Sequence, residues 1–277
     1  MSAMEVSASF STMCYKHLKF LTRLAHNVPD LHSKNIAFQL PNLDFWAIEQ
    51  IHEHFGKPNI NMVGRLDDQP LGPEVPPYTV EPAYFWSAEK EGPKQQIKII
   101  DFGEATLSTE ERKKLRTPML LQPPESFFGE SVELSADIWA FACTVFDIFG
   151  KRSLFEAFMP DKDSVLLEMI STLGMLPDRW WRKWDNRSQY FFTDGTQNTT
   201  TMTQTQEPRP LALRIEQMRL GQGGQLGEAP EQLNAEDLAG LQKLLTSMLR
   251  YEPVERATTE EVVKSEWLQQ LLQESQM

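Results

Sequence analysis

Apolar side chains recur with a helical period over most of the second half of the chain. This mixture of apolar and polar positions predicts helices over residues 134–149, 162–174, 236–250 and 258–273. The segment IWAFACTVFDIF, residues 138–149, is apolar almost throughout, so we expect a buried core helix that is too short to span a membrane. The same period over residues 10–26 predicts a further helix near the N-terminus.

Two short apolar runs of β type, residues 36–40 and 97–100, predict a pair of strands on either side of a long insertion. The insertion, residues 41–96, is rich in proline, glycine and charge, which is typical of a surface excursion. Within it, residues 43–56 predict a short amphipathic helix that ends at a glycine and packs through its apolar face, formed by Phe45, Ile48, Ile51 and Phe55.

Together, the predicted helices and strands indicate a fold class that is mainly α with short β hairpins. A polar stretch at about residues 192–232, biased toward Gln, Thr and Gly, predicts a loop. The chain has 277 residues, of which 40% are hydrophobic, enough for a substantial core. We therefore expect one domain over residues 1–277, interrupted by the insertion.

Charge and cysteine content narrow the possible partners and compartments. The formal net charge of −12 disfavours direct nucleic-acid binding, which needs basic surface to neutralise phosphates, and suits basic protein partners. The two cysteines lie far apart in sequence, so no disulfide framework is expected. The opening MSAMEVSASF has no signal-peptide pattern, and we expect a cytoplasmic or nuclear protein without membrane association.

Candidate chemistry lies in the segment PDLHSKNIAFQLP, residues 29–41, and in the DFG tripeptide that follows the second apolar run. Phosphoryl transfer needs a carboxylate that orients the attacking hydroxyl and oxygen ligands for magnesium. Asp30 can supply the base and Asn35 a metal-binding amide, while Asp101 can supply the metal carboxylate. Each of these signals alone is typical of a turn or a helix cap as much as of a catalyst.

Further motifs follow in one order: PPE at residues 123–125, then SADIW at 135–139, then YEPVERAT around Arg256. In this order the chain resembles the large, C-terminal lobe of eukaryotic protein kinases over residues ~10–270. The resemblance implies a Ser/Thr protein kinase that uses ATP and Mg²⁺. It also implies that Glu125 and Arg256 form a buried ion pair and that Asp137 supports the catalytic loop.

The resemblance assigns the remaining site residues as well. Phe102 is expected to pack beneath the metal carboxylate, and Gly103 lets the backbone turn. The lysine that the family places two residues after the catalytic aspartate is His32 here, and Lys34 is the nearest lysine that could replace it. The His-Arg pair that normally precedes the aspartate is Val28-Pro29, so control by an activation-loop phosphate is not expected.

The insertion looks like that of fungal relatives of the SR-protein kinases, which act on serines of basic, Arg/Ser-rich proteins. Residues 44–91 hold nine acidic and three basic residues, a net charge of −6 that suits such a substrate. A solvated acidic surface loop explains the same count.

The small lobe of the kinase fold has no counterpart in the sequence. Nothing before residue 10 resembles a Gly-rich loop over the phosphates, a strand lysine or its helix glutamate, so we expect weak or incomplete activity from this chain. Two alternatives remain open: a noncatalytic scaffold derived from a kinase, and a small-molecule phosphotransferase of the aminoglycoside-kinase type, which shares the DLHxxN pattern.

Overall fold

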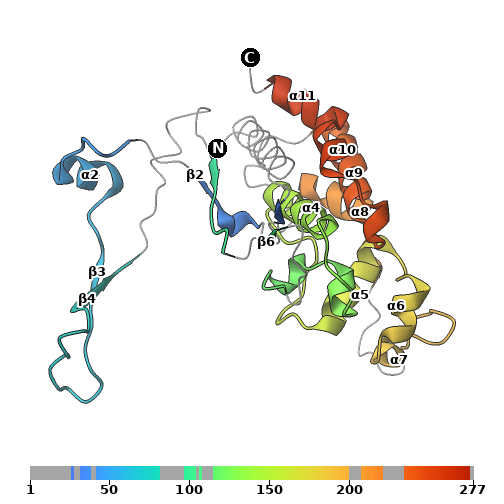
Figure 1. The fold of residues 1–277 in the computed structure, drawn as a ribbon, viewed down its shortest axis with the longest axis horizontal. Helices are drawn as coiled ribbons and strands as arrows, with labels where there is room; N and C mark the ends of the chain where they lie inside the picture. The colour runs from blue at the N-terminus through green and yellow to red at the C-terminus, as the bar shows by residue number, and fades with distance from the viewer. Residues whose placement is uncertain are drawn as a thin grey trace. The chain divides into compact units, whose positions relative to one another are not determined.

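A computed structural model describes residues 26–27, 32–38, 42–81, 97–103, 106–107, 115–199, 207–220 and 234–274 (Figure 1). The chain forms two compact units. Unit 1 comprises Met1–Ala37 with Ile97–Met277, and unit 2 comprises Phe38–Gln96. The helix predicted over residues 10–26 lies outside the described residues.

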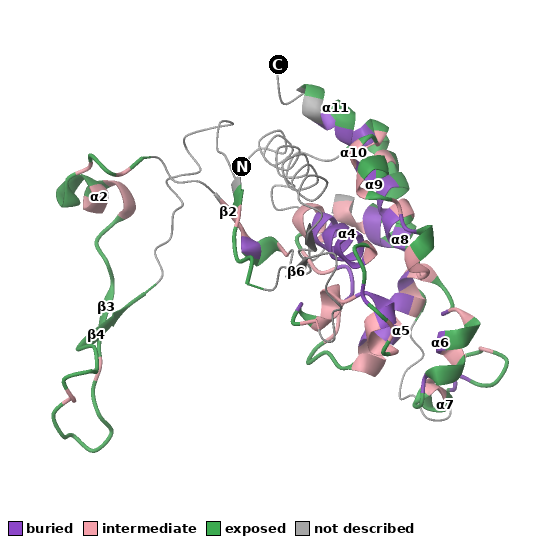
Figure 2. Cartoon of the chain, in the orientation of Figure 1, coloured by how far each residue is buried: buried purple, intermediate pink, exposed green. Residues whose placement is uncertain are grey.

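The core of unit 1 is built around one helix, α4 (Ser135–Gly150). All residues from Ala136 to Phe146 are buried, and Figure 2 shows this helix as the most completely buried element. The apolar run that predicted a buried core helix is therefore confirmed. Helix α9 (Ala235–Met248) and the 3₁₀ turns η3 (Met119–Leu121) and η5 (Pro253–Glu255) pack on α4.

Side-chain caps fix where several helices begin. Asp161 accepts a hydrogen bond from the Ser164 N–H at 2.8 Å and starts α5 (Lys162–Leu173). Asn234 starts α9 in the same way, and Thr258 starts α10 (Thr259–Val263). The helix predicted over residues 258–273 is in fact two helices, because α10 ends and α11 (Glu266–Glu274) begins a few residues later.

Shorter helices complete unit 1. They are α3 (Pro124–Phe127), α6 (Asp178–Lys183), α7 (Arg187–Tyr190), α8 (Leu211–Glu216) and the 3₁₀ turn η4 (Gln217–Leu220). Helix α8 corrects the polar loop predicted at about residues 192–232: it lies inside that stretch and buries Leu211, Arg214 and Ile215. Among the described residues, no helix has the length and apolar character that crossing a bilayer requires.

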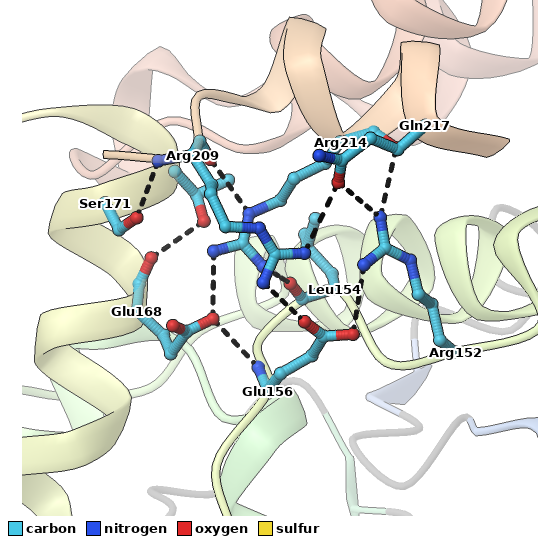
Figure 3. Close-up of polar contacts among 9 residues, drawn as sticks. Arg152, Leu154, Glu156, Glu168, Ser171, Arg209, Arg214 and Gln217 are labelled. Carbon is cyan, nitrogen blue, oxygen red and sulfur yellow. Dashed lines mark hydrogen bonds and ion pairs between the residues drawn. The ribbon is translucent and has the colours of Figure 1, made fainter. Parts of the chain in front are cut away.

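Arg214 joins three parts of unit 1 through its guanidinium group (Figure 3). It donates to the Leu154 carbonyl at 2.7 Å, to the Arg209 carbonyl at 2.9 Å and to the Glu168 carboxylate at 2.9 Å. Burial lowers the pKa of Arg214, while the nearby Glu168 charge opposes that shift. The arginine thus fastens α8 to α5 and to the loop after α4.

Unit 2 contains a helix and a hairpin. Helix α2 (Ile48–Phe55) ends at Gly56, whose φ of +85° favours glycine, so the predicted helix and its end are confirmed. The predicted apolar face is covered only in part: Phe45 and Ile48 are exposed, whereas Ile51 and Phe55 are half-buried. Strands β3 (Ile60–Met62) and β4 (Tyr78–Val80) form an antiparallel hairpin within the stretch that was predicted to be a surface loop.

Unit 1 holds two small sheets of two strands each among its described residues. Strand β1 (His26–Asn27) pairs antiparallel with β6 (Thr106–Leu107). Strand β2 (Ile36–Phe38) pairs with β5 (Ile97–Ile99), which confirms the predicted pairing of the two apolar runs.

Candidate active site

The two small sheets bring together two loops that are distant in sequence. The first loop runs between β1 and β2, and the second runs between β5 and β6. Because β1 pairs with β6 and β2 pairs with β5, both ends of the first loop are hydrogen-bonded to the ends of the second. The candidate residues Asn35 and Asp101 lie on these two loops.

Asn35 is held from both sides by the backbone. The turn η1 (Ser33–Asn35) precedes β2, and its Asn35 N–H donates to the His32 carbonyl at 2.8 Å. The Asn35 carbonyl accepts from the Ile100 N–H at 2.9 Å, and the residue is buried. Asn35 therefore lies at the end of the β2–β5 ladder, one residue from the DFG tripeptide on the partner strand.

Asp101 follows directly and adopts a left-handed backbone conformation with φ of +61°. Its side chain accepts a hydrogen bond from the Gly103 N–H at 3.3 Å, which closes a tight turn. The carboxylate is exposed. Phe102 is 41% exposed, and the packing of its ring beneath the carboxylate stays a prediction.

The donor set fits a magnesium ion that is shared with phosphates. Asn35 and Asp101 offer one amide oxygen and one carboxylate, both hard oxygen ligands. No cluster of three or more His, Cys, Asp or Glu side chains occurs in the part of the chain that the structure describes. Two protein ligands are enough for Mg²⁺, which keeps waters and substrate phosphates in its coordination shell.

For the other residues predicted to form or support this loop, the structure gives at most their burial. Asp30, the predicted base, lies outside the described residues. Lys34 is exposed and His32 is half-buried. Asp137 is buried in the first turn of α4, and its role in supporting the loop remains a prediction.

Asp147 is a site residue that the sequence interpretation missed. Its carboxylate accepts a hydrogen bond from the Ser33 hydroxyl at 2.7 Å, so the last turn of α4 anchors η1. Asp137 lies near the opposite end of the same helix, about 15 Å away at 1.5 Å per residue. The available signal was a single carboxylate within an otherwise apolar core helix.

Glu125 and Arg256 meet under the surface, as the resemblance implies. The guanidinium donates to both carboxylate oxygens, at 2.8 Å and 2.6 Å, and both side chains are almost completely buried. Arg256 also donates to the Ser135 carbonyl at 3.1 Å and the Tyr251 carbonyl at 3.0 Å. One arginine thus joins α3, the start of α4 and the segment before α10.

A second ion pair holds the chain just after α3. Arg179 on α6 donates to both oxygens of Glu130, at 3.3 Å and 3.2 Å, and also pairs with Glu252. The Trp180 indole donates to Glu130 at 2.8 Å. Burial raises the pKa of Glu130, but the hydrogen bonds from Arg179 and Trp180 outweigh this, so the pKa lies below its ordinary value.

The chain is similar in sequence to known proteins. The family model of the protein kinase domain matches residues 89–268. A serine/threonine protein kinase of Aspergillus fumigatus is 27% identical over 174 residues, which are 61% of this chain and 39% of that protein. The dual specificity protein kinase CLK2 of Homo sapiens is 25% identical over 172 residues, 61% of this chain and 31% of that protein.

A solved structure extends the likeness to the fold. The crystal structure of a kinase domain superposes with a TM-score of 0.58 at 19% identity, and the match covers 96% of this chain and 66% of that one. The match to the family model includes residues 101–103, Glu125 and Arg256, and it starts after the loop that carries Asn35.

Proposed function

This chain belongs to the protein kinase family, and we propose that it transfers a phosphoryl group from ATP to serine hydroxyls of basic, Arg/Ser-rich proteins. The observation that supports the proposal most strongly is the hydrogen bond between the Asn35 carbonyl and the N–H of Ile100, the residue before Asp101, at one end of the β2–β5 ladder. Family membership argues against the alternative of a small-molecule phosphotransferase.

In the proposed reaction the chain orients the reactants and neutralises charge. Asn35 and Asp101 hold Mg²⁺, which when bound offsets the negative charge of the phosphates. Asp30 accepts the proton of the attacking serine hydroxyl. The backbone bonds of Asn35 and the Ser33–Asp147 hydrogen bond keep the loop in place before substrate arrives, which limits the reorganisation needed during transfer.

The proposed substrate class follows from charge. Unit 2 carries a large acidic excess, and a field of one sign attracts a partner of the opposite sign and speeds its association. We propose that this excess attracts basic substrate to the chain. The cytoplasmic or nuclear location stays a proposal of the same kind.

We further propose that these 277 residues alone bind ATP weakly. The sequence before the candidate loop has no glycine-rich motif and no pattern of a strand lysine with its glutamate partner. In kinases these groups cover and clamp the phosphates.

The test is transfer of labelled phosphate to an Arg/Ser peptide by this chain fused to the small lobe of a related kinase. Asp30→Asn removes the base and Asp101→Asn removes the metal carboxylate, so each variant should lose at least ~100-fold in rate. Asp185→Asn, which removes an exposed carboxylate of unit 1 outside the proposed site, is the control and should retain most of the activity.

Full activity in the Asp30→Asn fusion would show that the loop is assigned wrongly. A noncatalytic scaffold is the second candidate, because the sequence before the candidate loop shows no glycine-rich motif. It predicts no transfer by the fusion and no saturable Mg-ATP binding.

A further inference from the structure

The hairpin of unit 2 has one polar and one apolar face. Its polar face is held together by Glu81, which accepts hydrogen bonds from Asn59 at 2.8 Å and Asn61 at 3.0 Å. These two bonds lower the pKa of Glu81, so the carboxylate stays charged. Because side chains alternate along a strand, the neighbouring residues point to the other face.

That other face is entirely apolar. Ile60 lies opposite Val80, and Met62 lies opposite Tyr78. Residues directly opposite each other in an antiparallel pair share a face, so these four side chains form one patch, which we call the hairpin patch. Their exposed fractions are 52%, 53%, 76% and 46% in the order given.

Nothing in the described part of the chain buries this patch. All six strand residues of the hairpin are exposed, and β3 pairs only with β4 among the described strands. An isolated two-stranded hairpin is marginally stable in water, and exposed apolar groups rimmed by polar residues commonly mark interaction sites. The hairpin patch therefore has the character of a surface that a partner covers.

Charge indicates the nature of that partner. Between residues 42 and 81, seven residues are acidic and two are basic, a net charge of −5. One of the two cations, Arg65, already donates to Asp67 at 2.7 Å, which leaves the acidic excess uncompensated within this part of the chain. A partner segment with apolar side chains and basic neighbours matches both the patch and its surroundings.

We propose that the hairpin patch is the docking surface for an extended, basic segment of the substrate protein, in which apolar residues alternate with arginine or lysine. When the segment lies beside a strand edge of the hairpin, its apolar side chains extend the face of Ile60, Met62, Tyr78 and Val80, and its alternate, basic side chains lie on the face of Glu81. The proposal rests on the proposed function for the class of partner. It adds an apolar requirement that an Arg/Ser repeat alone does not meet.

The experiment measures binding of fluorescein-labelled peptides to the full chain by anisotropy, without nucleotide. The probes are a peptide that alternates valine with arginine, one that alternates serine with arginine, and one that alternates valine with glutamate. The Val-Arg peptide should bind at least ~10-fold more tightly than the Ser-Arg peptide, the effect of a few lost apolar contacts. The Val-Glu peptide should not bind.

Two double variants locate the site. Ile60→Thr with Met62→Thr should weaken Val-Arg binding at least ~10-fold while keeping strand propensity. As the control, Thr79→Ser with Gln69→Asn changes hairpin residues outside both the patch and the Glu81 hydrogen bonds and should leave affinity unchanged. Equal affinity for the Val-Arg and Ser-Arg peptides, or no effect of the first variant, overturns the proposal.

Amide hydrogen exchange gives a third outcome that would overturn the docking proposal. Slow amide exchange over residues 60–62 and 78–80 in the free chain, lost in the Ile60→Thr, Met62→Thr variant, would mean that the chain itself covers the patch. Because the assay measures only peptide binding and contains no nucleotide, its failure would not contradict the proposed phosphoryl transfer.

Discussion

Arg214 and Arg256 are both buried, and each guanidinium is surrounded by backbone carbonyls and one carboxylate. A buried cation without such partners would cost several kcal/mol, so each arginine holds its neighbours in a single arrangement. Arg256 joins Glu125 from 131 residues away, and Arg214 joins Leu154 from 60 residues away. The two residues are therefore cross-links between elements that have no local reason to meet.

The Glu125–Arg256 pair gives a direct prediction for stability. Arg256→Ala and Glu125→Ala should each lower the free energy of unfolding by ~3–5 kcal/mol, because each leaves a buried charge unpaired. The double variant should lose less than the sum, by ~1 kcal/mol or more. Urea melts of the four proteins measure the coupling. Effects that add within ~0.3 kcal/mol would mean that the two side chains do not interact.

The Glu130–Arg179 pair predicts a dependence on pH. The pKa of Glu130 is lower in the folded chain than in the unfolded one, so its stabilising contribution is present above the unfolded pKa and disappears as pH falls through the folded pKa. Because the pair is partly exposed, Glu130→Gln should cost less than ~1 kcal/mol at neutral pH. The difference between the two proteins should shrink as pH falls below the ordinary glutamate pKa of about 4.3 and vanish below the lower pKa of the folded chain. Urea melts at neutral and acid pH measure it, and a difference independent of pH contradicts the assignment.

Residue contacts were partly predictable from the sequence. The Glu125–Arg256 pair follows from motif order, because the resemblance supplies the fold that brings the two residues together. The Ser33–Asp147 hydrogen bond and the Arg214 network were not foreseen, since they depend on how α4, α5 and α8 pack. Sequence spacing carries no information about such contacts when the partners lie on different elements.

Among the helices, the prediction that was confirmed is the one in which burial determines the sequence pattern. The apolar run of α4 correctly predicted the core helix, because a helix with apolar side chains on all sides is stable only when other elements cover it on all sides. The 258–273 prediction missed the break between α10 and α11, which no proline or glycine marks. Helix α8 was missed because only six residues carry it within a polar stretch.

The insertion leads to a prediction about folding. No residue between 57 and 81 is buried, and a surface loop changes closure entropy only slowly with its length. A deletion that joins Gly56 to Lys94 should therefore change the melting temperature by less than ~3 °C, the effect of about 1 kcal/mol in a domain of this size. Thermal melts by circular dichroism measure the change. A much larger loss would show that the insertion packs on unit 1.

At the scale of the whole molecule, the proposed function depends on two small sheets, β1–β6 and β2–β5. They hold the loop that contains Asn35 against the loop that contains Asp101, although 66 positions separate the two residues. The pairing of β2 with β5 was predictable, because both are short apolar runs that flank the insertion. The position of Phe102 was not, since its environment depends on groups that a local sequence pattern does not specify.

The central claim is that Asn35 and Asp101 together form the metal-nucleotide site, and paramagnetic broadening by Mn²⁺-ATP tests it even when affinity is weak. In NMR spectra of the isotope-labelled chain, amide signals of residues 33–36 and 100–103 should broaden first. Asp101→Asn should abolish that selectivity, and Asp68→Asn should not. Broadening that begins instead among the acidic residues of unit 2, unaffected by Asp101→Asn, would contradict the account.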